Sequence, residues 1–189
     1  MIGLSEYLYG QFTVAGTVSD KLLIFDVDDT LIHTTAEIFI VKNGKRVKTI
    51  SNQNYNNYKL RPGESFDYQE FDDPKILSKE TFTKYWDTLK REYRKGTHIS
   101  ILTARSDADM IRDFFLKNGI DIKKELVFAV GDPKLGLHGT VQEKKAQVIE
   151  HIAHLGYKTL VFFDDDEGNL AAAKKLEYPL GVKIHTIKV

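Results

Sequence analysis

The chain has 189 residues, 42% of them hydrophobic and 29% charged, which suits one globular domain with a sizeable core. Lys plus Arg and Asp plus Glu both number 27, so the net charge gives no general reason to expect nucleic acid or an anionic membrane as a partner. The absence of cysteine excludes disulfides, zinc–thiolate sites and cysteine nucleophiles.

The N-terminal segment predicts no export signal. Residues 1–16 lack the basic start of a secretory signal peptide and carry polar residues among the apolar ones. No run in the chain approaches the roughly 20 apolar residues that a membrane-spanning helix needs. We therefore expect a cytoplasmic protein without a membrane partner.

Short apolar runs alternate with helical patterns along the chain. Runs rich in β-branched and aromatic residues predict strands at 22–27, 98–103, 125–130, 159–164 and 181–187. Apolar spacing and capping signals predict helices from Ser78 to Gly96, Ser106 to Asn118, Thr140 to Gly156 and over about 167–177, closed by Pro179. This alternation indicates an α/β protein with a doubly wound, Rossmann-like parallel sheet and helices on both faces.

The interval after the first strand holds a small insertion, over about 34–77. Asn43-Gly44 is a strong hairpin signal, and β-rich runs at 37–41 and 46–50 flank it. The interval has room for this hairpin and a loop but for no large helical domain. We therefore expect a single domain over 1–189 that carries a small β-hairpin flap.

Polar groups stand at the ends of three predicted strands. They are Asp26, Asp28 and Asp29 on the first, Thr103, Ala104 and Arg105 on the second, and Asp164, Asp165 and Asp166 on the fourth. Parallel neighbours end at the same sheet edge, where ligands bind, so these groups should converge. Clustered carboxylates repel one another without a cation, and oxygen ligands suit Mg²⁺, which usually binds together with a phosphate. Arg105 and a lysine at 144–145 suit the remaining phosphate oxygens.

Each of these groups, taken singly, has a structural explanation. An Asp-x-Asp after a strand is commonly a turn or a helix cap, and the three acids from Asp164 could cap the next helix. Thr103 alone would be a strand end, and Lys145 alone a solvated helix face. Their joint occurrence, in this order at strand ends and helix starts, favours a phosphoryl-transfer site.

In these motifs the chain resembles the haloacid dehalogenase-like (HAD) hydrolases, most of which are Mg²⁺-dependent phosphatases. Residues 22–30, LLIFDVDDT, match the family's first motif, hhhhDxDxT, and ISILT, ending in Thr103, matches the second. The third motif is a lysine early in a helix, and TLVFFDDDEGN at 159–169 matches the fourth. The motifs span about 21–178, which is most of the chain.

The resemblance implies a role for each matched residue. Asp26 is the nucleophile that forms an aspartyl-phosphate, and Asp28 is the acid that protonates the leaving oxygen and then the base that activates water. Thr103 and the backbone at Ala104 hold the phosphoryl group, while a lysine offsets its charge. The Mg²⁺ ligands are Asp26, the backbone carbonyl of Asp28 and an acid of the fourth motif.

Three assignments have alternatives. Family helices place the lysine directly before a pattern that 146–156 reproduces, which favours Lys145 over Lys144. Either Asp164 or Asp165 is the main metal ligand of the fourth motif. In the polynucleotide 3′-phosphatase branch, an arginine placed like Arg105 contacts the substrate phosphate; the alternative is a salt bridge to a neighbouring loop.

The position four residues beyond Asp165 departs from the family pattern. Where many members carry a further Asp, this chain has Asn169. Support for the metal is then weaker or comes from Asp164. Asp166 is free to cap the next helix, and we assign Asp29 no chemistry beyond capping the turn beneath it.

The resemblance implies a phosphomonoester substrate, and the predicted flap suggests its class. From Ile38 to Gly63 there are six basic residues and no acid, with Tyr55 and Tyr58 among asparagines. Basic groups interleaved with aromatic ones suit a nucleotide or a nucleic-acid end, although a solvated hairpin face is the alternative. A small flap leaves the site open, which suits macromolecular ends, or small substrates if a second subunit of a homo-oligomer closes it.

Two other functions compete with this one. The protein could hydrolyse the phosphate of a small metabolite such as a sugar, with the flap's charge incidental. It could also be a catalytically silent binding or regulatory module that keeps the fold. The presence of Asp26, Asp28, Thr103 and a lysine argues against the silent module.

Overall fold

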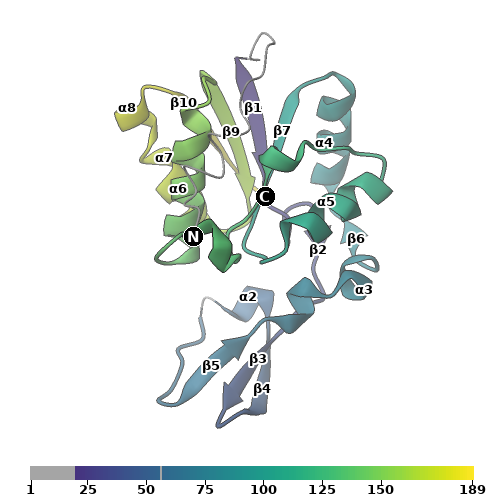
Figure 1. The fold of residues 1–189 in the computed structure, drawn as a ribbon, viewed down its shortest axis with the longest axis vertical. Coiled ribbons are helices and arrows are strands. Elements are labelled where there is room, and N and C mark those ends of the chain that lie inside the picture. The colour runs from purple at the N-terminus through teal and green to yellow at the C-terminus, as the bar shows by residue number, and fades with distance from the viewer. Residues whose placement is uncertain (1–19, 56) are drawn as a thin grey trace.

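The computed structural model describes residues 20–55 and 57–189 (Figure 1). The expectation for residues 1–16 therefore lies outside the described part of the chain. Within that part, no helix has both the length and the apolar character needed to cross a membrane.

A five-stranded parallel sheet forms the centre of the protein, in the order β10-β9-β1-β7-β8. Its strands are β1 (Lys21–Phe25), β7 (His98–Thr103), β8 (Val127–Ala129), β9 (Thr159–Asp164) and β10 (Lys183–Lys188). The chain builds outward from β1 through β7 to β8, then returns to the other side of β1 with β9 and β10. The two directions separate between β1 and β9, so a crevice at the carboxyl ends of these strands is where a ligand is expected.

Helices cover both faces of this sheet because its central strands are apolar on both sides. On β1, Leu23 and Phe25 pack on one face, while Leu22 and Ile24 pack on the other. The first face is covered by α4 (Lys84–Arg94) and α5 (Ala108–Lys117). The second face is covered by α6 (Val141–Ala153) and α7 (Glu167–Lys174). The predicted α/β class with a parallel sheet flanked by helices is confirmed.

Several predicted boundaries are wrong for identifiable reasons. The helix expected from Ser78 begins at Lys84, because the Thr83 side chain accepts a hydrogen bond from the Tyr85 backbone N–H and caps it there. The strand expected over 125–130 is shortened by the 3₁₀ turn η2 (Lys124–Leu126).

The other two differences concern helix ends. The helix expected from Ser106 is capped by Asp107 and begins at Ala108. Pro179 does not close α7; it lies inside a separate short helix, α8 (Glu177–Leu180), which follows the end of α7 at Lys174. A proline is tolerated there because it stands in the first turn, where the backbone N–H would have no partner within the helix.

A second, antiparallel sheet is inserted after β1, in the order β4-β3-β5. The predicted hairpin is present: β3 (Glu37–Lys42) and β4 (Lys45–Ser51) are joined by Asn43 and Gly44, whose φ angles are 51° and 72°. Positive φ at both turn residues is what a tight two-residue hairpin requires. The sequence did not predict β5 (Glu64–Asp67), which pairs with β3.

We call residues 34–77 the small module. Besides the sheet it contains α2 (Asn52–Tyr55), the 3₁₀ turn η1 (Gln69–Asp72) and α3 (Pro74–Leu77). It has its own apolar cluster, in which Ile38, Ile40 and Phe71 are buried. The short strands β2 (Ile32–His33) and β6 (Thr81–Phe82) pair next to its two ends and connect it to the main sheet.

The small module lies on the side of the parallel sheet where β1, β7 and β9 end (Figure 1). Asp29, directly after β1, accepts hydrogen bonds from Asn52 Nδ2 at 3.0 Å and from Gln53 Nε2 at 2.7 Å, both on α2. Thr34 N–H donates to the same carboxylate at 3.3 Å, so Asp29 caps a turn and also anchors the module.

Candidate active site

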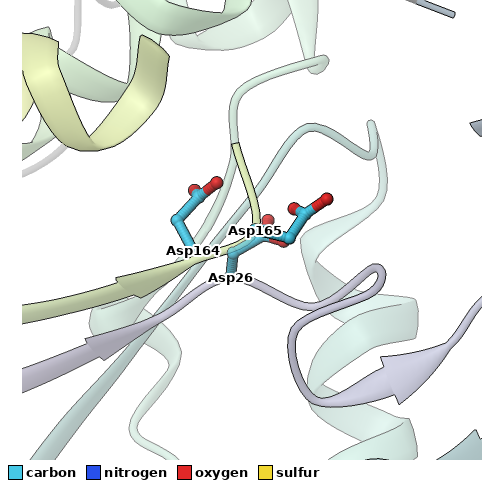
Figure 2. A group of neighbouring side chains, drawn as sticks. All are labelled: Asp26, Asp164 and Asp165. Atoms are coloured by element: carbon cyan, nitrogen blue, oxygen red, sulfur yellow. The ribbon is translucent and has the colours of Figure 1, made fainter. Parts of the chain in front are cut away.

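Three carboxylates meet at the carboxyl ends of β1 and β9. Asp26 follows β1, while Asp164 ends β9 and Asp165 comes next; Figure 2 shows the three side chains leaving these neighbouring strand ends. One carboxylate oxygen from each lies within 4.8 Å of the other two. Asp26 and Asp164 are buried and Asp165 is half-buried. A 3.0 Å hydrogen bond from Asp26 N–H to the Phe163 carbonyl holds the ends of β1 and β9 side by side.

Lys145 connects two of these acids. Its ammonium lies 2.8 Å from Asp26 Oδ1 and 2.8 Å from Asp164 Oδ2, with its side chain only 3% exposed. The capping box of Thr140 and Glu143 starts α6 so that its fifth residue faces the strand ends. Lys145, and not the neighbouring Lys144, therefore occupies the position expected for the active-site lysine.

Burial and neighbouring charge oppose each other at this lysine. Burial by itself would lower the pKa of the Lys145 ammonium, but the facing carboxylates of Asp26 and Asp164 raise that pKa above its ordinary value. Lys145 is therefore a permanent cation at physiological pH. Removing either acid would leave a buried charge only half compensated.

The positive charge of Lys145 does not balance the three carboxylates around it. Burial, reinforced by Asp164 and Asp165, raises the pKa of the Asp26 carboxyl well above its ordinary value, although Lys145 opposes the shift. Burial and the adjacent Asp164 raise the pKa of Asp165 to about 6. One lysine thus faces three acids, and among the described residues no cationic side chain forms an ion pair with Asp165.

This arrangement fits a divalent cation. Carboxylate oxygens are the donors that Mg²⁺ prefers, and a doubly charged ion would balance the two negative charges that Lys145 leaves. The residues that would hold it are Asp26 and Asp165. Asp164 also offers a carboxylate oxygen to the group. The carboxylate of Asp28 is not part of this group; the predicted contribution of its backbone carbonyl stays a prediction.

Asn169 supports Asp164 in place of the missing acid. Its Nδ2 lies 3.0 Å from Oδ1 and 3.1 Å from Oδ2 of Asp164, and the Asp166 N–H donates to Oδ1 at 2.8 Å. Asp164 is fully buried and has partners on both oxygens, whereas Asp165 is the more open acid. Asp166 caps α7, as predicted, by accepting a hydrogen bond from the Asn169 N–H.

Asp28 stands apart from the three acids and is paired with Arg105. Nη2 and Nε of Arg105 donate to Oδ1 and Oδ2 of Asp28 at 2.7 Å and 3.0 Å. The guanidinium was expected to face a substrate phosphate, with a salt bridge to a neighbouring loop as the alternative. The structure contains the salt bridge, and the Arg105 side chain has no exposed surface.

The loop after β7 is held by a close backbone contact. Thr103 is buried, and its hydroxyl oxygen accepts a hydrogen bond from the Arg105 N–H at 3.2 Å, while Ala104 is exposed. Gly131, after β8, packs so closely that a Cβ there would lie 2.6 Å from the Ala104 carbonyl oxygen. Only glycine fits beside this rigid backbone, so Gly131 keeps the loop bearing Thr103 in place.

Several residues that support the site from elsewhere in the chain have no sequence signal of their own. No local motif marks Gly131, Asn52, Gln53 or the carbonyl of Phe71. The sequence offers only their position: Gly131 follows a predicted strand, and the other three lie in the insertion.

The chain matches no protein-family model, no curated protein and no solved structure.

We predict that Asp165→Asn stabilises the metal-free protein at pH 7.5. The carboxyl has a pKa of about 6 in the folded state, above its ordinary value of 3.8, so the folded state loses stability as pH rises from about 4 to about 6. Removing the charge should raise the free energy of unfolding by roughly 1 kcal/mol, because partial exposure screens the repulsion. Denaturant unfolding in EDTA at pH 7.5 and pH 4 measures this, with no gain expected at pH 4.

Asp164→Asn is the matched control. This change removes a fully buried partner of Lys145, so it should destabilise the metal-free protein at the same pH. Adding excess Mg²⁺ should stabilise the wild type more than Asp165→Asn, since binding to the folded state alone adds stability. An Asp165→Asn protein that is no more stable than the wild type in EDTA would contradict this account of the site.

Proposed function

We propose that this protein is a Mg²⁺-dependent phosphomonoesterase of the HAD-like type, acting through an aspartyl-phosphate. The observation that carries the proposal is the buried contact of Lys145 with both Asp26 and Asp164, at the carboxyl ends of adjacent strands. In this reading the fold is doubly wound, and the small module is a flap over the site. Mg²⁺ would offset charge on the phosphate and orient it toward the nucleophile.

The side chains divide the chemistry between them. A carboxylate oxygen of Asp26 attacks phosphorus as the bond to the leaving oxygen breaks, and a proton from Asp28 is transferred to that leaving group. Asp28 then takes a proton from the water that hydrolyses the aspartyl-phosphate. Lys145 stays charged throughout and stabilises the equatorial oxygens in both steps. The Thr103 hydroxyl and the backbone at Ala104 hold the phosphoryl group.

For the substrate we favour a nucleotide or a nucleic-acid end. Of the basic residues in the small module, Arg46 is already engaged within the module and is therefore a poor candidate for binding the substrate. It pairs with Asp67 at 2.8 Å and lies over the Phe39 ring at 3.7 Å. Lys48 has no acidic partner among the described residues, and its ammonium lies 4.7 Å from the centre of the Tyr58 ring.

A groove on the small module places Lys48 beside polar and aromatic groups. It has a volume of about 400 Å³ and runs between β4 and α2, where Asn54, Asn57 and Tyr58 line it together with Lys48. Asn52, the first residue of α2, contacts Asp29, and Asn54 of the same helix lines the groove. A cation, an aromatic ring and amides in one groove suit the base and phosphate of a nucleotide next to the reacting phosphate.

The direct test of the proposed reaction is Asp26→Asn. The amide keeps the shape of the side chain but is a poor nucleophile, so phosphatase activity measured with Mg²⁺ on p-nitrophenyl phosphate should fall at least about 10³-fold. The wild type should lose activity in EDTA and regain it with Mg²⁺. Equal activity of the wild type and Asp26→Asn would sink the mechanism, and an inactive, folded wild type on every phosphomonoester screened would favour the silent module.

The substrate class is tested by Lys48→Glu, with Lys45→Glu as its control. Both changes reverse one charge on β4, but Lys45 is at the hairpin turn and does not line the groove. For 3′-phosphorylated oligonucleotides or nucleoside monophosphates, Lys48→Glu should raise KM about 10-fold, while Lys45→Glu and the hydrolysis of p-nitrophenyl phosphate change little. Equal effects of the two variants, or a better rate with sugar phosphates, would instead favour a small-metabolite phosphatase.

A further inference from the structure

Among the residues that the structure describes, Asp28 and Arg105 form the most buried ion pair outside the three-acid group. The Arg105 side chain is 0% exposed and that of Asp28 is 11% exposed. Two parallel hydrogen bonds, of 2.7 Å and 3.0 Å, join the guanidinium to the two carboxylate oxygens. Such a fork fixes both the position and the rotation of a carboxylate, which a lysine cannot do.

The same guanidinium also contacts the small module. Its Nη1 donates a hydrogen bond to the Phe71 carbonyl in η1, and its carbon lies 5.3 Å from the centre of the Phe71 ring. The next residue, Ser106, donates from Oγ to Asp72 Oδ2 at 2.5 Å and from its N–H to Asp72 Oδ1 at 3.3 Å. Arg105 thus joins an acid at the end of β1 to the part of the module that rests on the β7 loop.

The fork occupies only part of the hydrogen-bonding capacity of the Asp28 carboxylate. A carboxylate has about four lone-pair positions, and Arg105 uses one on each oxygen, so another remains on each for the proton that Asp28, in the proposed mechanism, gives to the leaving oxygen and then takes from water. Without the fork, the Asp28 side chain would rotate about its χ angles, and its oxygens would lose their fixed direction. General acid catalysis depends on that direction.

We propose that Arg105 is a positioning residue, which holds the proton-transferring carboxylate of Asp28 in line with the leaving oxygen and makes that alignment depend on docking of the small module. The inference rests on the proposed phosphatase function. It assigns Arg105 to Asp28 and not to the substrate phosphate. Loss of the fork should therefore affect protonation of the leaving group and spare the binding of the phosphoryl group.

Two substrates with different leaving groups separate these roles. A nucleoside monophosphate releases an alkoxide, which needs a proton, whereas p-nitrophenyl phosphate releases a stable anion, which does not. We expect Arg105→Lys to lower kcat/KM about 10- to 100-fold for the nucleotide and less than about 3-fold for the aryl phosphate. Asp28→Asn should show the same asymmetry, and the double variant should be no worse than Asp28→Asn alone.

Arg112→Lys is the matched control. Arg112, on α5, also contacts a carbonyl, that of Ile122, and a carboxylate, that of Asp121, but through one hydrogen bond each and with its side chain 32% exposed. It should leave both rates unchanged. If Arg105→Lys does not fold, Arg105→Ala with added guanidinium is measured in its place, and guanidinium should restore the nucleotide rate more than the aryl rate. Asp72→Ala, at an exposed contact, should shift the ratio of the two rates in the same direction by about 3-fold.

The outcomes distinguish the possible roles. Equal losses for both substrates in Arg105→Lys would overturn the proposal, because a purely structural residue or a direct phosphate ligand affects both alike. An unchanged ratio in Asp72→Ala would overturn the dependence on the small module. A wild type inactive on both substrates with Mg²⁺ would refute the phosphatase function itself, a result separate from failure of the leaving-group asymmetry.

Discussion

The ammonium of Lys145, held between Asp26 and Asp164, is the interaction on which the site depends. Three carboxylates at the ends of β1 and β9 repel one another, and burial makes each charge costlier. A single permanent cation at 2.8 Å from two of them makes the arrangement tolerable but incomplete. The shortfall is concentrated on Asp165, the most open of the three, and that is where a divalent ion would contribute most. A cation bound there would offset this repulsion and so stabilise the folded state.

The acids of the first strand end have three different environments. Asp26 forms an ion pair with Lys145, Asp28 forms one with Arg105, and Asp29 accepts hydrogen bonds from side-chain amides on α2. Each acid therefore has its own donors, and in the proposed mechanism the three serve as nucleophile, proton-transferring group and anchor for the small module. Asp28, through Arg105, and Asp29 both link the loop to the small module, so under the proposed function proton transfer depends on where that module lies.

Local sequence patterns predict the strands of the parallel sheet, the start of α6 and the acids at the strand ends, because neighbouring residues determine these features. Apolar runs ending in acids located the strand ends, and the capping box at Thr140 located the start of α6; the choice of Lys145 came from the family pattern at 146–156. What the sequence could not show are contacts between distant segments with no motif of their own. Arg105 pairs with Asp28, 77 residues away, and reaches the Phe71 carbonyl, a backbone group that no residue pattern marks. Gly131 matters only because another loop happens to pass within 2.6 Å of where its Cβ would be.

The central claim is that Asp26 becomes covalently phosphorylated, and trapping that species tests it most directly. Protein quenched in acid during turnover of a phosphomonoester with Mg²⁺, then reduced with borohydride and digested, would be analysed by mass spectrometry. An acyl phosphate is reduced to the alcohol, so the account predicts homoserine at position 26 and unmodified Asp28, Asp164 and Asp165. Active protein with no modified residue, or with the modification at another acid, would contradict it.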